Sequence, residues 1–368
     1  MALAHDCKGV QPPVNVRPAP VMKPARSFVS AEEVARLAGV SRSAVSRAFT
    51  PGASVSEETR KRVMEAAQNL GYHVNHLARG LMRQQSGIVC LIVSDVDTPF
   101  QSRLARNLIG RLQQAGKVAM VINSSGSPEA VAGAVRQTLN YRADATVVLS
   151  GTPDRAIART CLDHGQELIL INRDQDFDEA HTITVANRDA ARQAVLAFER
   201  AGCRRLACVT SQAGTPSLAE REQAFLQAAR QAGFEPIHWR QGRTTYETGA
   251  EAARALFTRQ VTPDAAFCIN DLMACGFVDA ARKEFGLRVP EDLCVIGFDD
   301  IEQAGWRAYD LTTFAQPIDR IADKVAVLVR DGSAGGRSGD RIGTRTCLDA
   351  PLIWRGTVRA PDLSQQDG

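Results

Sequence analysis

The stretch "SAEEVARLAGVSRSAVSRAF", residues 30–49, contains the signals for two short helices separated by one glycine. Ser30 followed by Glu33 is a capping box, which predicts that a helix begins here, and Gly39 is placed to end it. Ser41 is then suited to cap a second helix. Two short helices joined by a glycine turn are typical of a helix-turn-helix.

The second helix is predicted to have an apolar inner face and a polar outer face. Val45 and Ala48 would point inward. The outer face would carry Arg42, Ser43, Ser46 and Arg47. Long cationic side chains and short hydroxyls of this kind can hydrogen-bond base edges and phosphates in a major groove. The same pattern would also suit an ordinary helical hairpin with a solvated surface.

A third helix gives this pair something to pack against. The segment "VSEETRKRVMEAAQNLGY", residues 55–72, has a serine cap and a glycine stop around an apolar stripe of Val63, Ala66, Ala67 and Leu70. On the first helix we expect an apolar stripe of Val34, Leu37 and Ala38. These three helices would form a small all-α headpiece with its own hydrophobic core.

The charge of the chain is unevenly distributed. The net charge is only +3, but residues 22–87 carry ten Lys/Arg against five Asp/Glu. A basic end on a mildly acidic body indicates a polyanionic partner for that end, although a solvated charged surface would give the same count. Residues 1–27 lack periodicity, so we expect a disordered tail, and Met22 is a possible alternative start.

Composition also argues against several classes of protein. No apolar run approaches the roughly 20 residues needed to span a bilayer, and prolines occupy the N-terminus where a signal peptide needs an apolar core. The nine cysteines include no CxxC pair. We therefore expect reduced thiols in a cytoplasmic protein, with no disulfide framework, no metal site and no cofactor.

The pattern changes at "SGIVCLIVSD", residues 86–95, where apolar strand-like runs begin to alternate with helical segments. This alternation predicts α/β architecture with doubly wound parallel sheets, covered by helices on both faces. Such sheets bind ligands beyond the carboxyl ends of their strands. Polar residues directly follow several of these runs, among them Asn123, Asn172, Arg173, Asn270, Asp271 and Asp299.

The headpiece sequence resembles a known family. "EVARLAGVSRSAVSRAF" and "VSEETRKRVMEAAQNLGYHVNHLARGLM", residues 33–49 and 55–82, look like the headpiece of the LacI/GalR family of bacterial transcriptional regulators. The resemblance implies that Arg42, Ser43 and Arg47 contact base edges of double-stranded DNA. It further implies that Ser30, Ser41 and Ser46 hold phosphates.

The stretch "NHLARGLM", residues 75–82, resembles the family's hinge helix, which folds on operator DNA and pairs with a second copy in the minor groove. Leu81 stands where the family has a leucine that wedges into the central base step. Asn75 and Ala78 are the other positions of this segment expected at the DNA. Without DNA we expect a disordered linker.

The resemblance continues over the body as the family's periplasmic-binding-protein-like core. "TPSLAEREQAF", "CINDLMACGFVDA" and "VIGFDDIEQAGWRAYDLTTFAQP" carry it, with Ala224 and Ala186 as departures. It implies that a small effector is bound by Arg221, Asn270, Asp299 and Gln316, with Phe100 and Trp306 as apolar walls. Other interpretations stay open: Asp299, Asp300 and Asn270 are also suited to helix caps, and Trp306 to simple packing.

These observations predict a definite organisation of the chain. A headpiece at 28–73 is followed by a hinge at 74–86 and an effector-binding, dimerising core at 87–360. We expect the first subdomain of that core to comprise about 87–185 and 317–345. The second would comprise about 186–316 and 346–360. No room remains for a C-terminal heptad tail, so a homodimer is expected.

Two other functions share some of these features. A solute-binding protein of a transport system would have the same core, but it would also have a signal peptide and no basic headpiece. An enzyme would need a base or nucleophile pair, and the sequence offers no phosphate loop, GxSxG elbow or histidine cluster. We therefore predict a DNA-binding repressor, not an enzyme, controlled by a sugar or a sugar acid. Arg173 and Arg221 would suit the acid, and Asp299 the hydroxyls.

Overall fold

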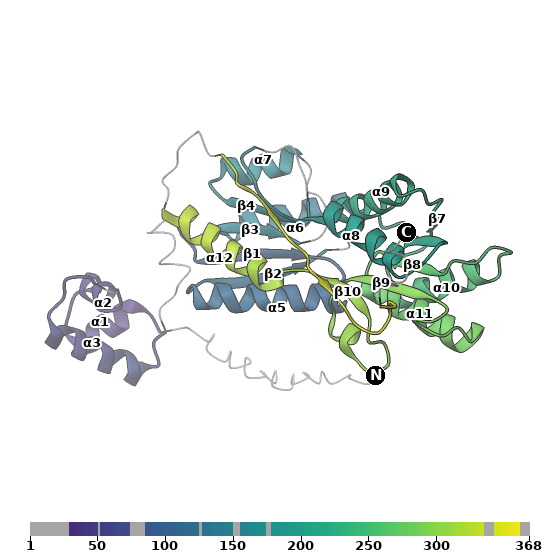
Figure 1. The fold of residues 1–368 in the computed structure, drawn as a ribbon. Coiled ribbons are helices and arrows are strands. Elements are labelled where there is room, and N and C mark those ends of the chain that lie inside the picture. The colour runs from purple at the N-terminus through teal and green to yellow at the C-terminus, as the bar shows by residue number, and fades with distance from the viewer. Residues whose placement is uncertain are drawn as a thin grey trace, which may run out of the picture. The chain divides into compact units, whose positions relative to one another are not determined.

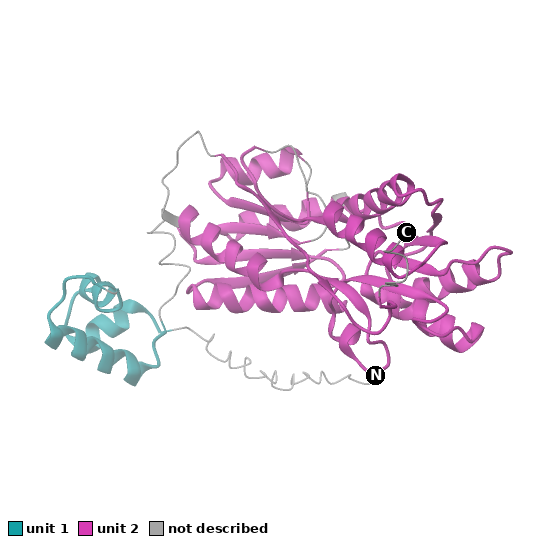
Figure 2. Cartoon of the chain, in the orientation of Figure 1, with its two compact units in different colours: residues 1–76 teal, residues 77–368 magenta. Residues whose placement is uncertain are grey.

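The computed structural model describes residues 29–50, 52–73, 85–124, 127–149, 155–173, 178–334 and 342–360. The chain divides into two compact units, residues 1–76 and 77–368, shown in Figure 2. The predicted tail and the linker positions Asn75, Ala78 and Leu81 lie outside the described residues.

The first unit is the headpiece, with helices α1 (Ala31–Ala38), α2 (Arg42–Ala48) and α3 (Glu57–Leu70). The capping box forms at the start of α1: the Glu33 amide donates to Ser30 Oγ at 3.3 Å, and the Ser30 amide donates to Glu33 Oε2 at 2.7 Å. Gly39 ends α1 in the left-handed conformation, at φ 66°. The helix boundaries therefore follow from local caps that the sequence displays.

The headpiece has a small hydrophobic core of its own, which consists of Val34, Ala35, Ala38, Val45, Ala48, Val63, Ala66 and Ala67. The expectation for Leu37 is wrong, because this side chain is 55% exposed. A helix turns about 100° per residue, which places Leu37 about 100° away from the centre of the stripe formed by Val34, Ala35 and Ala38.

The second unit contains two α/β lobes. The first lobe is a parallel sheet in the order β11-β5-β4-β3-β1-β2. Its strands are β1 (Ile88–Val93), β2 (Val118–Asn123), β3 (Ala145–Val148), β4 (Glu167–Ile171), β5 (His181–Val185) and β11 (Arg345–Leu348). Its helices are α5 (Pro99–Gln114), α6 (Pro128–Asn140), α7 (Arg155–Asp163) and α12 (Ile318–Ala334).

Helices cover both faces of this first sheet (Figure 1). Side chains of β1 alternate between the faces: Val89, Leu91 and Val93 pack with α5 and α12. Ile92 faces the opposite way and packs in the cluster that contains residues of α6 and α7. Burial on both faces explains why β1 is apolar throughout rather than alternating.

The second lobe is a sheet in the order β12-β10-β9-β8-β6-β7, in which β12 pairs antiparallel with β10. Its strands are β6 (Leu206–Thr210), β7 (Ile237–Arg240), β8 (Ala265–Cys268), β9 (Cys294–Asp299), β10 (Thr312–Ala315) and β12 (Leu352–Ile353). The helices are α8 (Asn187–Arg200), α9 (Pro216–Gln231), α10 (Tyr246–Phe257) and α11 (Asp271–Phe285), with a 3-10 turn, η1 (Glu302–Gly305). Figure 1 shows α8 and α9 on one side of the sheet and α10 and α11 on the other.

Two glycines allow α10 and α11 to pack closely. A Cβ atom built on Gly249 would lie 1.9 Å from the carbonyl oxygen of Met273, and one on Gly276 would lie 1.9 Å from that of Tyr246. No side chain fits at such distances. The helices therefore approach each other at these two positions as backbone against backbone.

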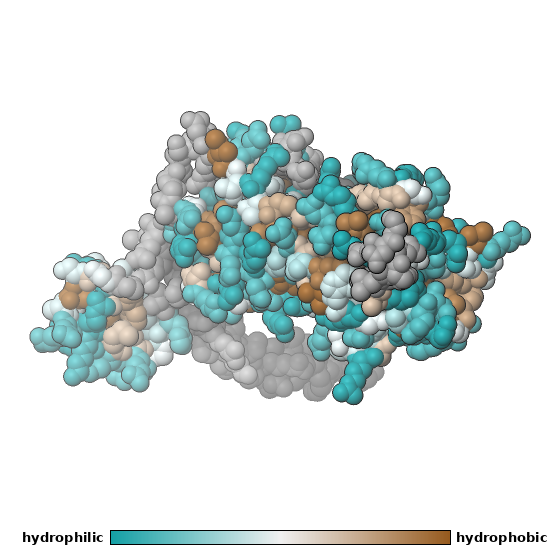
Figure 3. Space-filling model, in the orientation of Figure 1, coloured by the Kyte–Doolittle hydropathy of each residue, from teal (hydrophilic) through white to brown (hydrophobic). Residues whose placement is uncertain are grey.

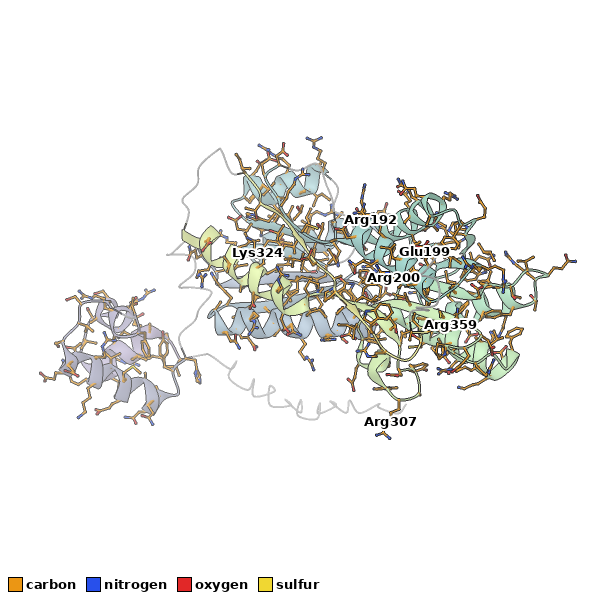
Figure 4. The ribbon with its side chains drawn as sticks, viewed as in Figure 1. Arg192, Glu199, Arg200, Arg307, Lys324 and Arg359 are labelled. Carbon is orange, nitrogen blue, oxygen red and sulfur yellow. The ribbon has the colours of Figure 1, made fainter. Side chains whose placement is uncertain are left out.

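The chain passes between the lobes next to β5, β10 and β11. Because β11 pairs with β5 in the first sheet, the last passage follows Leu348, later than the predicted boundary at 345/346. After this passage, Arg359 binds the end of the described chain to the second lobe (Figure 4). Its guanidinium donates to the carbonyl oxygens of Ala201 and Pro290 at 3.1 and 2.9 Å.

The surface of the α/β unit is mainly polar. In the face that Figure 3 shows, hydrophilic residues cover most of the unit and apolar residues are scattered among them. Within the described part of the chain, none of the helices combines the length and the apolar character that crossing a membrane requires.

Candidate functional site

The outer face of α2 is exposed as the sequence predicts. Arg42, Ser43, Ser46 and Arg47 are all exposed, whereas Val45 and Ala48 are buried in the headpiece core. The polar side chains therefore share one face of the helix, opposite the core. This face exposes two guanidinium groups and two hydroxyls that can hydrogen-bond a binding partner.

The hydroxyls of Ser30 and Ser41 have partners inside the headpiece. Ser30 Oγ donates its hydrogen to Glu33 Oε2 at 2.9 Å. The bond from the Ser30 amide and this bond from the Ser30 hydroxyl lower the pKa of Glu33. Ser41 Oγ accepts from the Ala44 amide at 3.2 Å and lies 2.9 Å from Ser43 Oγ. Because a hydroxyl has only one hydrogen, a bond that Ser30 donated to a phosphate would replace its bond to Glu33 Oε2, while its oxygen could still accept from the Glu33 amide in the capping box.

In the α/β unit, Arg221 is the centre of a buried polar cluster. It lies on α9 with 2% of its surface exposed. Its Nε donates to Asn187 Oδ1 at 2.7 Å and its Nη1 to the carbonyl oxygen of Ile269 at 3.1 Å. Nη1 is 3.9 Å from Asp299 Oδ1, and the guanidinium carbon lies 3.5 Å from the centroid of the Phe298 ring.

A chain of hydrogen bonds connects this cluster to the first lobe. Asn172, directly after β4, donates through Nδ2 to Gln316 Oε1 at 3.1 Å, and Gln316 Nε2 donates to Asp299 Oδ1 at 2.7 Å. Because β4 belongs to the first sheet and Asp299 ends β9 of the second, the bonds cross from lobe to lobe. We call Asn172, Gln316, Asp299 and Arg221 the lobe junction.

Burial strongly affects the ionisable groups at this position. Burial raises the pKa of Asp299 to about 6, although the nearby Arg221 charge and the Gln316 hydrogen bond act in the opposite direction. Burial and the Asp299 charge raise the pKa of Asp271 to about 8. Burial lowers the pKa of Arg221 to about 10, which still leaves it protonated at neutral pH.

Further contacts join the two lobes near the lobe junction. Arg103 on α5 donates through Nη1 to the carbonyl oxygen of Asp300 at 2.7 Å. An exposed ion pair connects Arg243 to Asp95 at 3.2 Å. Phe100 packs against the hydrophobic cores of both lobes.

The remaining candidates have varied surroundings. Asn270 is the N-cap of α11 and accepts from the Met273 amide at 3.0 Å, so the cap interpretation is confirmed for it. The cap interpretation is wrong for Asp299 and Asp300, because Ile301 is the N-cap of η1. Trp306 follows η1 and is 48% exposed. Among the described contacts, none joins Trp306 or the exposed Asn123 to the lobe junction. Arg173 is buried, and burial lowers its pKa to about 10.

Asn187, Asp271 and Phe298 complete the cluster; of these, Asp271 is predicted from the sequence as a candidate ligand group, and Asn187 and Phe298 are not. Asn187 holds Arg221, and Asp271 Oδ2 accepts from the Ile301 amide at 2.9 Å, which fixes the turn after β9. The signal for Asp271 is its position with Asn270 directly after a strand-like run. Within the described residues, Oδ1 of Asn172 is buried without a hydrogen-bond partner, so it is an acceptor available to a ligand.

Comparison with known proteins connects these features to a family. A model of the bacterial regulatory proteins of the lacI family matches residues 31–75, and a model of periplasmic binding protein-like domains matches residues 195–358. The HTH-type transcriptional repressor CytR of Escherichia coli strain K12 is 30% identical over 334 residues, covering 89% of this chain and 96% of CytR.

Solved structures agree over nearly the whole chain. A lac repressor dimer bound to operator and the anti-inducer ONPF has a TM-score of 0.81 at 23% identity, covering 91% of this chain and 100% of that one. The CelR–cellobiose complex, a transcriptional regulator, has a TM-score of 0.64 at 26% identity, covering 89% and 99%. The likeness to CytR spans both units, so the chain belongs to the LacI family of bacterial regulatory proteins.

Proposed function

We propose that this protein is a cytoplasmic repressor that binds a pseudo-palindromic operator as a homodimer. A small effector either raises or lowers its affinity for that operator. The exposed polar face of α2 is the observation that carries the DNA-binding part. The relative CytR, which spans the same two units, is a repressor. The proposal assigns no reaction to the chain.

On the headpiece, we assign base reading to Arg42, Ser43 and Arg47. Arginine can grip guanine with two parallel hydrogen bonds, which distinguishes base pairs in the major groove. Ser46 is assigned to a phosphate, as are Ser30 and Ser41 in their second role beside the caps. Asn75, Ala78 and Leu81 are assigned to the minor groove at the centre of the operator.

Selection of duplexes from a random pool by the full-length protein tests the DNA-binding part. Because protein symmetry must match DNA symmetry, the enriched duplexes should contain two related half-sites, and footprinting should protect both. A protein that enriches no sequence, or that protects a single asymmetric half-site, contradicts the proposal.

We place the effector at the lobe junction, with the other candidates Phe100, Asn123, Arg173, Asn270 and Trp306 around it. Asn172 Oδ1 and the Asp299 carboxylate supply acceptors there, and both suit ligand hydroxyls. A ligand at this position would touch both lobes. Differential contact with their open and closed arrangements is what allows a ligand to shift a protein between two states.

The charge balance at the lobe junction favours a neutral polyhydroxylated ligand, such as a sugar, over a sugar acid. Arg221 already donates to Asn187 and to Ile269, and its charge is faced by Asp299 at 3.9 Å. An acidic ligand would have to compete with that carboxylate. The CelR regulator, 26% identical, was solved with cellobiose, a neutral sugar.

Thermal unfolding of the full chain tests this assignment. Neutral sugars such as D-ribose and cellobiose are compared with D-gluconate and D-galacturonate. A ligand present at 100 times its Kd stabilises the native state by about 2.7 kcal/mol. We expect the responding ligand to be neutral and its effect to disappear in Asp299→Ala. A larger response to an acid would contradict the neutral assignment.

A further inference from the structure

The first residues of the α/β unit after the linker are held by one carboxylate. Asp144 Oδ1 accepts from the Ser86 amide at 2.7 Å and from Ser86 Oγ at 3.1 Å. Its Oδ2 accepts from the Gly87 amide and from Lys117 Nζ, both at 3.0 Å. The Asp144 side chain is only 9% exposed. Four donors therefore converge on a nearly buried carboxylate, and two of them belong to the backbone that leaves the linker.

The same backbone is fixed from the other side by the sheet. The Gly87 carbonyl accepts from the Val118 amide at 2.8 Å, and the Ile88 carbonyl accepts from the Asp144 amide at 2.8 Å. Gly87 has a φ of 74°, so a sharp turn precedes β1. The chain therefore enters the first sheet at a fixed point and in a fixed direction. We call Ser86, Gly87, Lys117 and Asp144 the linker joint.

Helix α5 connects the linker joint to the second lobe. Its 16 residues span about 24 Å. Near its start, Arg103 donates to the Asp300 carbonyl of the second lobe at 2.7 Å. Shortly after its end, Lys117 reaches Asp144. Helix α5 packs along α12 in front of the first sheet, as Figure 1 shows, so it is supported as a rigid element.

We propose that Asp144 is the positioning residue that transmits lobe movement to the DNA-binding headpiece. Its carboxylate fixes where the linker leaves the α/β unit, so a shift of α5 and the first sheet moves the start of the linker with it. This inference rests on the proposed effector-controlled DNA binding. It assigns Asp144 no contact with DNA or effector.

The charge of Asp144 is essential to this role. An asparagine has one acceptor oxygen in place of two, and its NH₂ group would face the Gly87 amide and the Lys117 ammonium, which are both donors. The Lys117 ammonium would also lose the charge of the carboxylate that it contacts at 3.0 Å. The linker joint should then open locally while the sheet strands stay paired.

The experiment compares full-length Asp144→Asn with Asp163→Asn, a matched control on α7 whose carboxylate is 58% exposed and pairs with Arg159. Hydrogen exchange reports on the amides of residues 86–88. Affinity is measured for a duplex that the wild-type protein enriched from a random pool and for a scrambled duplex. We expect about tenfold faster exchange and about tenfold weaker binding to the enriched duplex in Asp144→Asn only.

Binding to the scrambled duplex should stay unchanged, because it depends on phosphate contacts of the headpiece alone. A mere loss of folding would weaken both duplexes together. If Asp144→Asn does not fold, Ser86→Ala and Lys117→Met remove single partners of the carboxylate and should show the same pattern to a smaller degree. Unchanged exchange and unchanged preference for the enriched duplex in these variants would overturn the inference.

The outcome also separates this inference from the proposed function. If the wild-type protein enriches no duplex at all, the proposed function fails. Hydrogen exchange then still tests whether Asp144 fixes the backbone of residues 86–88, and unchanged exchange in Asp144→Asn would contradict that role. If the wild-type protein enriches an operator that Asp144→Asn binds equally well, the proposed function stands and the role proposed for Asp144 is wrong.

Discussion

Replacing Arg221 by methionine tests the buried cluster at the lobe junction most directly. Methionine has a similar length but no donors. The change would leave the Asn187 side-chain oxygen and the Ile269 carbonyl without the bonds they now accept at 2.7 and 3.1 Å. It would also leave the Asp299 carboxylate without the cation 3.9 Å away.

The expected cost can be assembled from these losses. A buried acceptor left without a partner costs about 1–3 kcal/mol, and breaking a buried ion pair by removing one partner costs about 3–5 kcal/mol. Two effects offset part of this: the desolvation of the guanidinium disappears, and the methionine sulfur keeps a contact with Phe298 worth about 0.3–1.5 kcal/mol. We expect the free energy of unfolding to fall by about 3 kcal/mol.

Urea unfolding of the full chain at neutral pH, followed by circular dichroism, measures this fall. Arg188→Met is the matched control, because Arg188 is 75% exposed and its pair with Glu220 is a surface ion pair. Such pairs contribute about 0–1 kcal/mol. A fall for Arg221→Met no larger than that of the control would refute the reasoning.

A double-mutant cycle with Asp299→Asn isolates the ion pair within this cost. In the Asp299→Asn background no buried charge is left unpaired, so Arg221→Met should cost at least about 1 kcal/mol less than in the wild-type background. Strictly additive effects of the two substitutions would show that the charges at 3.9 Å do not interact.

Three further predictions concern other parts of the chain. Arg47→Ala should cost about 1–3 kcal/mol in operator binding and relax the preference at one base pair, whereas Ser46→Ala should weaken all duplexes alike; the reverse pattern would exchange their assigned roles. Gly276→Ala should destabilise the second lobe by about 1–3 kcal/mol or more in urea unfolding, while Gly133→Ala, whose added methyl group would meet no neighbouring element within 4 Å, should be neutral or stabilising. Because the pKa of Asp271 rises from 3.8 to about 8 on folding, the free energy of unfolding should fall as pH rises between these values, and Asp271→Asn should flatten the profile.

The headpiece could be predicted from the sequence because its signals are local. Ser30 and Glu33 lie three residues apart, and their capping box decides where α1 begins without help from the rest of the chain. Gly39 likewise decides where the helix ends. The orientation of Leu37 was predicted wrongly because a short helix allows two adjacent stripes, and packing of the three helices selects between them.

The polar cluster could be predicted only in part. The sequence predicts Asp299 at a ligand site because it directly follows a strand-like run, and the resemblance to the family implies the same role for both Arg221 and Asp299. Asn187, which holds Arg221, lies 34 residues earlier in the chain, and no periodicity or spacing connects the two. Their contact depends on how α8 packs against α9, which is a property of the assembled lobe.

Backbone strain collects where the two sheets meet. Asp95, Asn172, Asp299 and Asp300 have φ values of 49°, 55°, 122° and 53°, and each lies at or just beyond the carboxyl end of a parallel strand. Non-glycine residues in such regions cost about 1–3 kcal/mol each unless their surroundings hold them there. Bonds between the lobes are among those that hold them: Asp95 pairs with Arg243, Asn172 and Asp299 share Gln316, and the Asp300 carbonyl accepts from Arg103. Separating the lobes would break these bonds, while bonds within each lobe, such as that from Arg355 to Asp300 Oδ1 at 2.7 Å, would remain. A ligand that replaces only a few of the bonds can therefore change the balance between the lobe arrangements, which is what an effector of a repressor must do.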